Sequence, residues 1–182
     1  MHRAQVSSCE SVSTPVKGHI HYESAFEDCL RSQQIPYVAV DEAKKAVFRD
    51  ARLKSFDFIV YSSNQTNWLA DVKGRRWVRR GNQSRPAWEN WVTQDDLDGL
   101  RAWEQVFGAG FGGLFVFAYW LEPEAEPPPE IVHVYHEQRY VFAGVPLAEY
   151  QLHARVHSPK WGTVNMPTAE FARHVRPLRE LL

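Results

Sequence analysis

The sequence predicts an α/β domain followed by a C-terminal α+β extension. Apolar residues recur at helical spacing in two segments, 22–30 and 97–107. Apolar runs of strand length cover residues 36–40, 56–61, 68–72 and 114–121. The order over residues 20–121 is therefore helix, three strands, helix, strand. A chain of 182 residues with 21 basic and 22 acidic side chains has the composition of one globular domain with an extension, or of two small domains.

The first helix begins near Tyr22 and ends before Pro36. From Tyr22 onward, apolar residues recur at i, i+4, i+7 and i+8, which gives the helix one apolar face. Glu23 and Glu27, four positions apart, border that face. Residues 1–17 are Ser-rich and aperiodic, and we expect them to form a flexible tail.

Three strands are predicted after this helix. Residues 36–40 indicate a short buried strand, and a charged connection follows over residues 41–54. The apolar runs 56–61 and 68–72 are separated by the polar tip 62–67. Two apolar runs around a short polar tip favour an antiparallel hairpin.

The second helix and the fourth strand complete the predicted core over residues 18–121. Thr93-Gln94-Asp95-Asp96 resembles a capping box and opens a helix that runs to about Phe107. The run 114–121 lacks polar alternation, which indicates a strand buried on both faces.

The remainder of the chain is predicted to form an extension that packs on this core. Residues 122–130 contain four Glu and four Pro, a composition typical of an extended, solvated linker. Residues 131–182 indicate a second hairpin, a short helix after Pro146 and a terminal helix from about Thr168 that Pro177 interrupts.

Composition also bears on location. Two cysteines cannot form a disulfide framework or a four-cysteine zinc site, which favours a reducing interior. The first 19 residues lack the apolar core of a signal peptide. The longest uncharged run, 105–121, contains four glycines and is too short to span a membrane. We therefore expect a cytoplasmic protein with no membrane segment.

Two carboxylates and a lysine mark the predicted hairpin. Asp57 stands at the start of its first strand, and Asp71-Val72-Lys73 ends the second. Side chains alternate along a strand, so Asp71 and Lys73 share a face, and strand pairing can place Asp57 beside them. Clustered carboxylates repel unless a cation or a shared proton intervenes, and their hard oxygens suit Mg²⁺ or Mn²⁺. Carboxylate, carboxylate and lysine suffice to hydrolyse a phosphodiester.

The acid-x-Lys triplet alone is not specific. A second match, Glu42-Ala43-Lys44, lies in the charged connection instead of a strand, and we discount it. The plainest alternative makes Asp57, Asp71 and Lys73 the solvated end of a hairpin with an ordinary surface ion pair. The apolar residues that continue the face of Asp57 argue against that alternative.

These residues resemble the PD-(D/E)xK superfamily of metal-dependent nucleases over residues 20–121. The resemblance implies a restriction-endonuclease-like core of helix, three strands, helix and strand with a mixed sheet. It implies Asp57 and Asp71 as metal ligands, the carbonyl of Val72 as a further ligand, and Lys73 as the group that orients the attacking water. Asp71 stands where Glu is commoner in that superfamily, and Phe56 where many members have Pro.

A glutamate on the first helix often completes the site in that superfamily. Both Glu27 and Glu23, one turn earlier, fit this role, and the sequence does not choose between them. The segment 21–27, His-Tyr-Glu-Ser-Ala-Phe-Glu, is also similar to the signature of the HYExAFE family of uncharacterised proteins.

A basic stretch directly follows the predicted site. Residues 73–88 contain six basic side chains and no acid, with two tryptophans between them. Arginines neutralise backbone phosphates and indoles stack on bases, which favours nucleic-acid contact. The alternative is a solvated loop whose tryptophans pack into the core. The expected nucleic-acid contacts are Arg75, Arg76, Trp77, Arg79, Arg80 and Arg85.

The sequence thus favours a Mg²⁺- or Mn²⁺-dependent nuclease, cutting DNA as an endo- or exodeoxyribonuclease. The alternatives are an inactive nuclease-fold module for nucleic-acid binding or protein interaction, and a scaffold whose basic loop contacts an acidic protein. The oligomeric state stays open, a homodimer included. Among eight histidines, the close pairs 19/21 and 133/136 do not match a recognised zinc motif, which favours surface or core roles for them.

Overall fold

The computed structural model describes residues 20–40, 54–77, 88–128 and 131–182. The expected tail over residues 1–17 and most of the charged connection lie outside the described residues. The helices are α1 (Ile20–Ser32), α2 (Gln94–Phe107), α3 (Leu147–His153), α4 (Thr168–His174) and α5 (Leu178–Leu181), with a 3-10 turn η2 (Pro159–Trp161). The strands are β1 (Tyr37–Ala39), β2 (Phe58–Val60), β3 (Asn67–Trp77), β4 (Val92–Thr93), β5 (Phe111–Leu121), β6 (Val132–Tyr135), β7 (Gln138–Pro146), β8 (Arg155–Ser158), β9 (Thr163–Asn165) and β10 (Arg176–Pro177).

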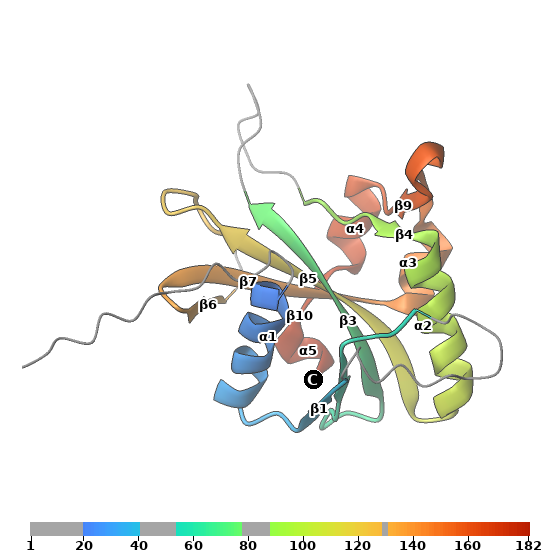
Figure 1. Ribbon diagram of the computed structural model, residues 1–182, viewed down its shortest axis with the longest axis horizontal. Helices are drawn as coiled ribbons and strands as arrows, with labels where there is room; N and C mark the ends of the chain where they lie inside the picture. The colour runs from blue at the N-terminus through green and yellow to red at the C-terminus, as the bar shows by residue number, and fades with distance from the viewer. Residues whose placement is uncertain (1–19, 41–53, 78–87, 129–130) are drawn as a thin grey trace, which may run out of the picture.

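A mixed seven-stranded sheet forms the centre of the molecule (Figure 1). Its strand order is β1-β2-β3-β5-β7-β10, and β6 pairs with β7. The hairpin β2–β3 is antiparallel as predicted, whereas β3 and β5 pair in parallel along their whole length. Parallel pairing needs a crossover, and α2 lies in the connection between β3 and β5.

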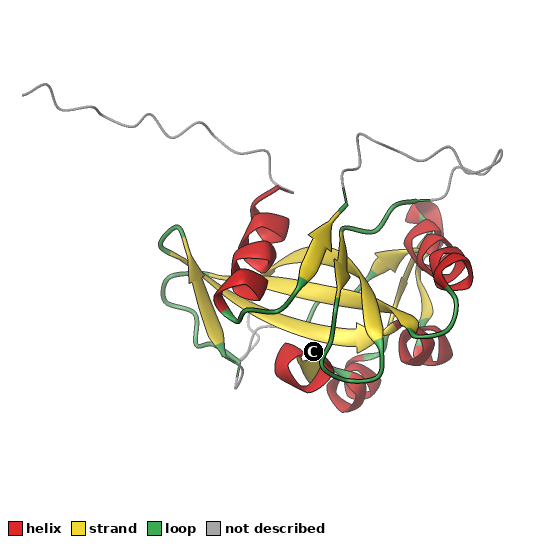
Figure 2. Cartoon of the chain, turned by 90° about the horizontal axis from the view of Figure 1, so that it is seen from below, coloured by secondary structure: helices red, strands yellow, loops and turns green. Residues whose placement is uncertain are grey.

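Helices cover both faces of the sheet (Figure 2). Helices α1 and α5 pack on the face that contains Ala70, Val72 and Val116. Helices α2, α3 and α4 pack on the opposite face, with Leu69 and Phe117. Because side chains alternate along β3, the odd-numbered residues of that strand face α2. This alternation decides on which side of the sheet each candidate residue lies.

Helix α1 lies close to the backbone of β3. A side chain at Gly74 would place its Cβ within 2.2 Å of the Tyr22 ring. Glycine at this position therefore lets the aromatic ring of α1 rest directly on the strand.

The first strand differs from its prediction. Residues 36–40 were predicted to form a buried strand, but β1 lies at the edge of the sheet, and Val38 is 48% exposed. An apolar run of five residues does not distinguish an edge strand from a central one, because both have the same local sequence.

The C-terminal residues continue the sheet of the core. Strand β7 pairs antiparallel with β5 from Leu114 to Leu121, and β10 pairs with β7. The segment expected to be a solvated linker is anchored: the Trp77 indole donates to the carbonyl of Glu126 at 2.9 Å. A small second sheet of order β4-β9-β8 joins the extension to the start of α2.

Candidate active site

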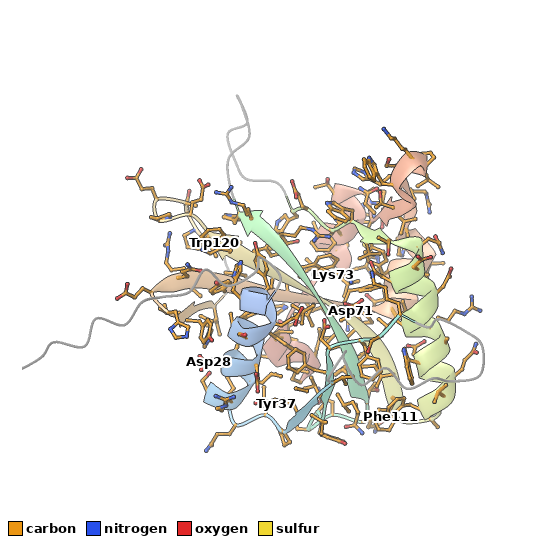
Figure 3. The ribbon with its side chains drawn as sticks, in the orientation of Figure 1. Asp28, Tyr37, Asp71, Lys73, Phe111 and Trp120 are labelled. Carbon is orange, nitrogen blue, oxygen red and sulfur yellow. The ribbon has the colours of Figure 1, made fainter. Side chains whose placement is uncertain are left out.

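Strand β3 presents Asp71 and Lys73 on one face, toward α2. The two side chains are two positions apart, and the Lys73 ammonium lies 2.8 Å from the Asp71 carboxylate. Figure 3 labels both residues on the central strand. Asp71 is only 5% exposed, which contradicts the alternative of a solvated hairpin end with a surface ion pair.

Helix α2 adds a second carboxylate, which the sequence did not mark as part of the site. Lys73 lies 3.0 Å from Asp96, and Lys54 also pairs with Asp96. Asp96 is the third helical residue of the capping box: its carboxylate accepts from the N–H of Thr93 at 2.7 Å, and the Thr93 hydroxyl accepts from the N–H of Asp96. One sequence feature could have indicated that Asp96 is buried: it lies one helical turn before Leu100, on the apolar face of α2.

Asp57 directly precedes the first residue of β2 and lies beside the backbone of β3. Its carboxylate accepts from the N–H of Val72 at 2.6 Å, and its own N–H donates to the carbonyl of Ala70 at 2.9 Å. The N–H and C=O of one strand residue point to the same neighbouring strand. The Val72 carbonyl is therefore on the edge of β3 that Asp57 occupies.

Burial and neighbouring charges act on Asp71 in opposite directions. Burial raises its pKa, Lys73 lowers it, and the carboxylates of Asp57 and Asp96 raise it further, so that the pKa is raised to about 7. Burial lowers the pKa of Lys73, but Asp71 and Asp96 outweigh burial and raise it. The Lys73 ammonium therefore keeps its charge inside the protein.

Asp96 shows the reverse behaviour. Burial raises its pKa, but the charge of Lys73 and the hydrogen bonds from Lys54 and Thr93 outweigh burial and lower the pKa to about 2. Two buried carboxylates near one lysine thus have pKa values well apart. Such separation of neighbouring acids is frequent at functional sites.

The donor set fits a hard divalent cation. Asp57, Asp71 and the Val72 carbonyl offer oxygen ligands of the kind that Mg²⁺ and Mn²⁺ prefer. The mutual repulsion that helps to raise the pKa of Asp71 is what a bound cation would relieve. These residues could therefore hold the metal that the sequence led us to expect.

The two candidate glutamates are carried by a helix on the other face of the sheet. Helix α1 packs with Val72, whereas Asp71 and Lys73 point toward α2. Glu27 accepts a hydrogen bond from the Tyr37 hydroxyl at 2.8 Å and pairs with Arg31 at 3.1 Å. The contacts of Glu27 thus go to Tyr37 and Arg31 and not to Asp71. The assignment of Glu23 stays a prediction.

The basic stretch divides into buried and exposed residues. Trp77 is 4% exposed and packs against Trp88 and Tyr119, so its indole cannot stack on a base. Arg75 is also buried, and its guanidinium donates to the carbonyl of Trp91 and covers the Trp91 ring. Burial thus contradicts nucleic-acid contact by Arg75 and Trp77, because β3 extends further than predicted and takes their side chains into the core.

Three of the residues assigned to nucleic-acid contact lie within the described part of the chain, and Arg76 is the exposed one of the three. Its guanidinium pairs with Glu122 at 2.8 Å and lies over the Trp120 ring. The remaining assigned contacts, Arg79, Arg80 and Arg85, lie outside the described residues.

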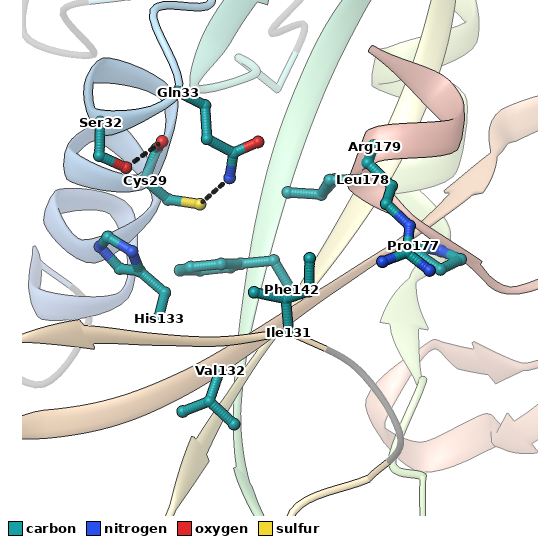
Figure 4. A pocket seen from close by; sticks show the side chains of 10 residues that line it. All are labelled: Cys29, Ser32, Gln33, Ile131, Val132, His133, Phe142, Pro177, Leu178 and Arg179. Atoms are coloured by element: carbon teal, nitrogen blue, oxygen red, sulfur yellow. Dashed lines mark hydrogen bonds between the residues drawn. The ribbon is translucent and has the colours of Figure 1, made fainter.

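A cavity of about 440 Å³ lies on the face of the sheet that α1 covers, between α1, β6, β7 and α5 (Figure 4). Cys29 lines it and accepts a hydrogen bond from the Gln33 amide at 3.1 Å. Burial raises the pKa of the Cys29 thiol to about 11. The thiolate is therefore scarce at neutral pH, and Cys29 does not have the properties of a nucleophile.

Within the part of the chain that the structure describes, no helix is long and apolar enough to cross a membrane.

The chain is similar in structure to Hjc, a Holliday junction resolvase from the archaeal hyperthermophile Archaeoglobus fulgidus. The TM-score is 0.53 and the sequence identity is 12%. The similarity covers 89% of this chain and 98% of that chain. No family model matches, HYExAFE included, and no curated protein matches. At 12% identity the likeness shows the fold alone, and it confirms the predicted fold class: this chain has a mixed α/β, restriction-endonuclease-like fold.

Proposed function

We propose that this protein is a metal-dependent nuclease that hydrolyses DNA phosphodiester bonds. The observation that carries the proposal is the placement of Asp71 and Lys73 on one face of β3, with Asp57 against the same strand. The restriction-endonuclease-like fold and the resolvase named above support it.

Each residue has a defined role in the proposed reaction. Asp57, Asp71 and the Val72 carbonyl would hold Mg²⁺ or Mn²⁺. When bound, such an ion supplies a bound water of lowered pKa and a polarised phosphoryl oxygen. Lys73 would orient the attacking water and stabilise the negative charge that develops on the phosphate. Water adds to phosphorus, the bond to the leaving oxygen breaks, and that oxygen takes up a proton.

Asp96 acts through Lys73 in this proposal. Its carboxylate, on helix α2, lies 3.0 Å from the Lys73 ammonium and holds that ammonium in position. Because Asp96 also raises the pKa of Lys73, it helps to keep the ammonium protonated despite burial. Asp96 is thus a positioning residue.

Exposed residues of the extension support contact with nucleic acid. Trp161 is 72% exposed, and the Lys160 ammonium lies over its ring. The next residue, Gly162, accepts a hydrogen bond from the N–H of Gln94 at the start of α2, two residues before Asp96. An exposed indole beside a basic side chain fits stacking on a base. We assign this surface, instead of Trp77, to the substrate.

A cleavage assay with matched variants tests the proposal. The full chain is incubated with Mg²⁺ or Mn²⁺ and with four-way junction, duplex or single-stranded DNA, or with RNA. We expect Asp71→Asn and Lys73→Ala to lower the cleavage rate by about 100-fold or more, as removal of a group that stabilises the transition state does. Asp95→Asn, an exposed acid of the same helix turn as Asp96, should cleave normally. Unchanged cleavage by either site variant would refute the assignment.

A catalytically inactive module that binds nucleic acid or a protein is the second candidate. The observation that favours it is the engagement of the Lys73 ammonium by two carboxylates, those of Asp71 and Asp96. Titration with Mn²⁺ separates the two candidates. An ion that binds the folded state raises its melting temperature by mass action. A rise that Asp71→Asn abolishes favours the nuclease, and no response favours the inactive module.

A further inference from the structure

Two histidines and a glutamate from distant segments meet at the ends of α3 and α4. His153 is the last residue of α3, and Glu170 and His174 lie one turn apart on α4. The three side chains offer ligand atoms that all lie within 4.8 Å of one another. Helical spacing of four places Glu170 and His174 on one face, and tertiary packing adds His153.

The distances between these atoms are close to those of a metal centre. The Glu170 carboxylate oxygen Oε2 lies 3.5 Å from Nδ1 of His153 and 3.9 Å from Nε2 of His174. Zinc bonds of 2.0–2.1 Å in tetrahedral geometry put neighbouring ligand atoms about 3.3 Å apart. To close the site, the two distances from Glu170 Oε2 would have to shorten by about 0.2 and 0.6 Å. The ligand nitrogens of the two histidines, which lie within 4.8 Å of each other, would have to approach by at most about 1.5 Å.

Outer contacts orient two of the three ligands, His174 and Glu170. The other nitrogen of His174, Nδ1, lies 3.0 Å from the Glu149 carboxylate, which Arg176 holds at 2.5 Å. Arg173 donates to Oε1 of Glu170 at 2.9 Å, which leaves Oε2 for the histidines. A carboxylate behind a ligating histidine is the usual second layer of contacts around zinc.

The three residues are partly open to solvent. Their side chains are 24%, 30% and 26% exposed for His153, Glu170 and His174. An ion can therefore enter without unfolding, and a fourth position remains for water. Phe171, next to Glu170, is fully buried against the sheet, so α4 holds its ligands on a packed helix.

We propose that His153, Glu170 and His174 form a binding site for a divalent transition metal, with Zn²⁺ as the best-suited ion. Two imidazoles and one carboxylate favour Zn²⁺ over Mg²⁺, which prefers oxygen ligands alone. The site joins α3 to α4 and is separate from the carboxylates of β3 and α2. An ion bound there stabilises the C-terminal extension. Binding at this site does not depend on the proposed nuclease activity.

Zinc titration of the chelator-treated, untagged full chain tests the site. We expect one equivalent of Zn²⁺ to bind and to raise the melting temperature. Co²⁺ in the same site should give the intense visible absorption of a four-coordinate ion. His153→Ala and His174→Ala should each abolish both signals. His157→Ala removes an exposed histidine of β8 and should bind Zn²⁺ normally, as should Asp71→Asn.

A further variant tests the outer contact. Glu149→Gln should weaken Zn²⁺ binding about 10- to 100-fold while the Co²⁺ spectrum keeps its form, because Glu149 orients His174 without binding the ion. Circular dichroism without metal shows whether each variant folds. If His153→Ala does not fold, His153→Gln replaces it. Absent Zn²⁺ binding, or binding that survives His153→Gln and His174→Ala, would overturn the proposal.

Discussion

The ammonium of Lys73 lies between a carboxylate of its own strand and Asp96 of α2, 3.0 Å away. This contact joins the crossover helix to the central strand at the candidate site. Asp96 also closes the capping box with Thr93, so one side chain both begins the helix and holds the lysine. The start of α2 and the position of the lysine are therefore coupled.

The role of Asp96 in stability can be measured directly. Asp96→Asn should lower the free energy of unfolding by roughly 2–4 kcal/mol near pH 7, because it weakens the cap and leaves a buried ammonium with one fewer partner. The folded-state pKa of about 2 is below the ordinary value of 3.8, so this stabilisation is present above pH 4 and is lost as the pH falls toward 2. Urea unfolding at several pH values measures the difference. Asp95→Asn serves as the control, and a difference independent of pH would contradict the prediction.

Asp71 should show the opposite pH dependence. Its pKa is raised from 3.8 to about 7, so ionisation is disfavoured in the folded protein, and metal-free stability falls as the pH rises from 4 to 7. Asp71→Asn cannot ionise. The melting temperature of this variant, measured in chelator, should therefore rise relative to the unaltered protein between pH 5 and pH 8. Parallel curves for the two proteins would show that the Asp71 pKa is not raised.

The contact of α1 with β3 depends on Gly74. A Cβ at this position would lie 2.2 Å from the Tyr22 ring, and Gly74→Ala should destabilise the protein by about 1–3 kcal/mol. Combining it with Tyr22→Ala should recover part of the loss, because the small side chain makes room for the methyl group. Denaturant unfolding of both single variants and of the double variant gives the coupling. If the destabilisations of the two single variants simply add in the double variant, the clash with the Tyr22 ring is not the cause of the loss in Gly74→Ala.

The two tryptophans next to the site should behave differently. Trp161→Ala should change stability by less than about 0.5 kcal/mol, because the side chain is 72% exposed. It should weaken the binding of single-stranded DNA by roughly 1–3 kcal/mol, the typical contribution of one stacked base. Trp77→Ala should instead destabilise the fold by about 3–5 kcal/mol. Fluorescence anisotropy and thermal melts separate these effects. Unaltered DNA binding by Trp161→Ala would exclude this surface as the contact.

Local patterns predicted the elements of this fold well. The apolar spacing of residues 22–30 corresponds to α1, and the capping box at Thr93 corresponds to the start of α2. The hairpin with Asp57 and Asp71 is present as β2 and β3. These features depend on neighbours a few positions apart, and the sequence displays such neighbours directly.

Contacts between segments that are far apart in the sequence were not predicted. The sequence did not indicate that Asp96 would reach Lys73, or that His153 would meet His174. It also did not show that α1, with Glu23 and Glu27, would pack on the face opposite Asp71. Trp77 was assigned to nucleic-acid contact, with packing into the core as the alternative, and the pairing of β3 with β5 brought its indole into the core.

The sequence by itself determined the order of the main helices and strands over residues 20–121 and placed an acid, an acid and a lysine on one hairpin. Only the tertiary structure decided which face each side chain occupies and which charges lie within reach of one another. The physical reason is that strand alternation fixes two opposite faces but does not say which helix will cover each. That choice arises from the burial of apolar surface summed over the whole chain.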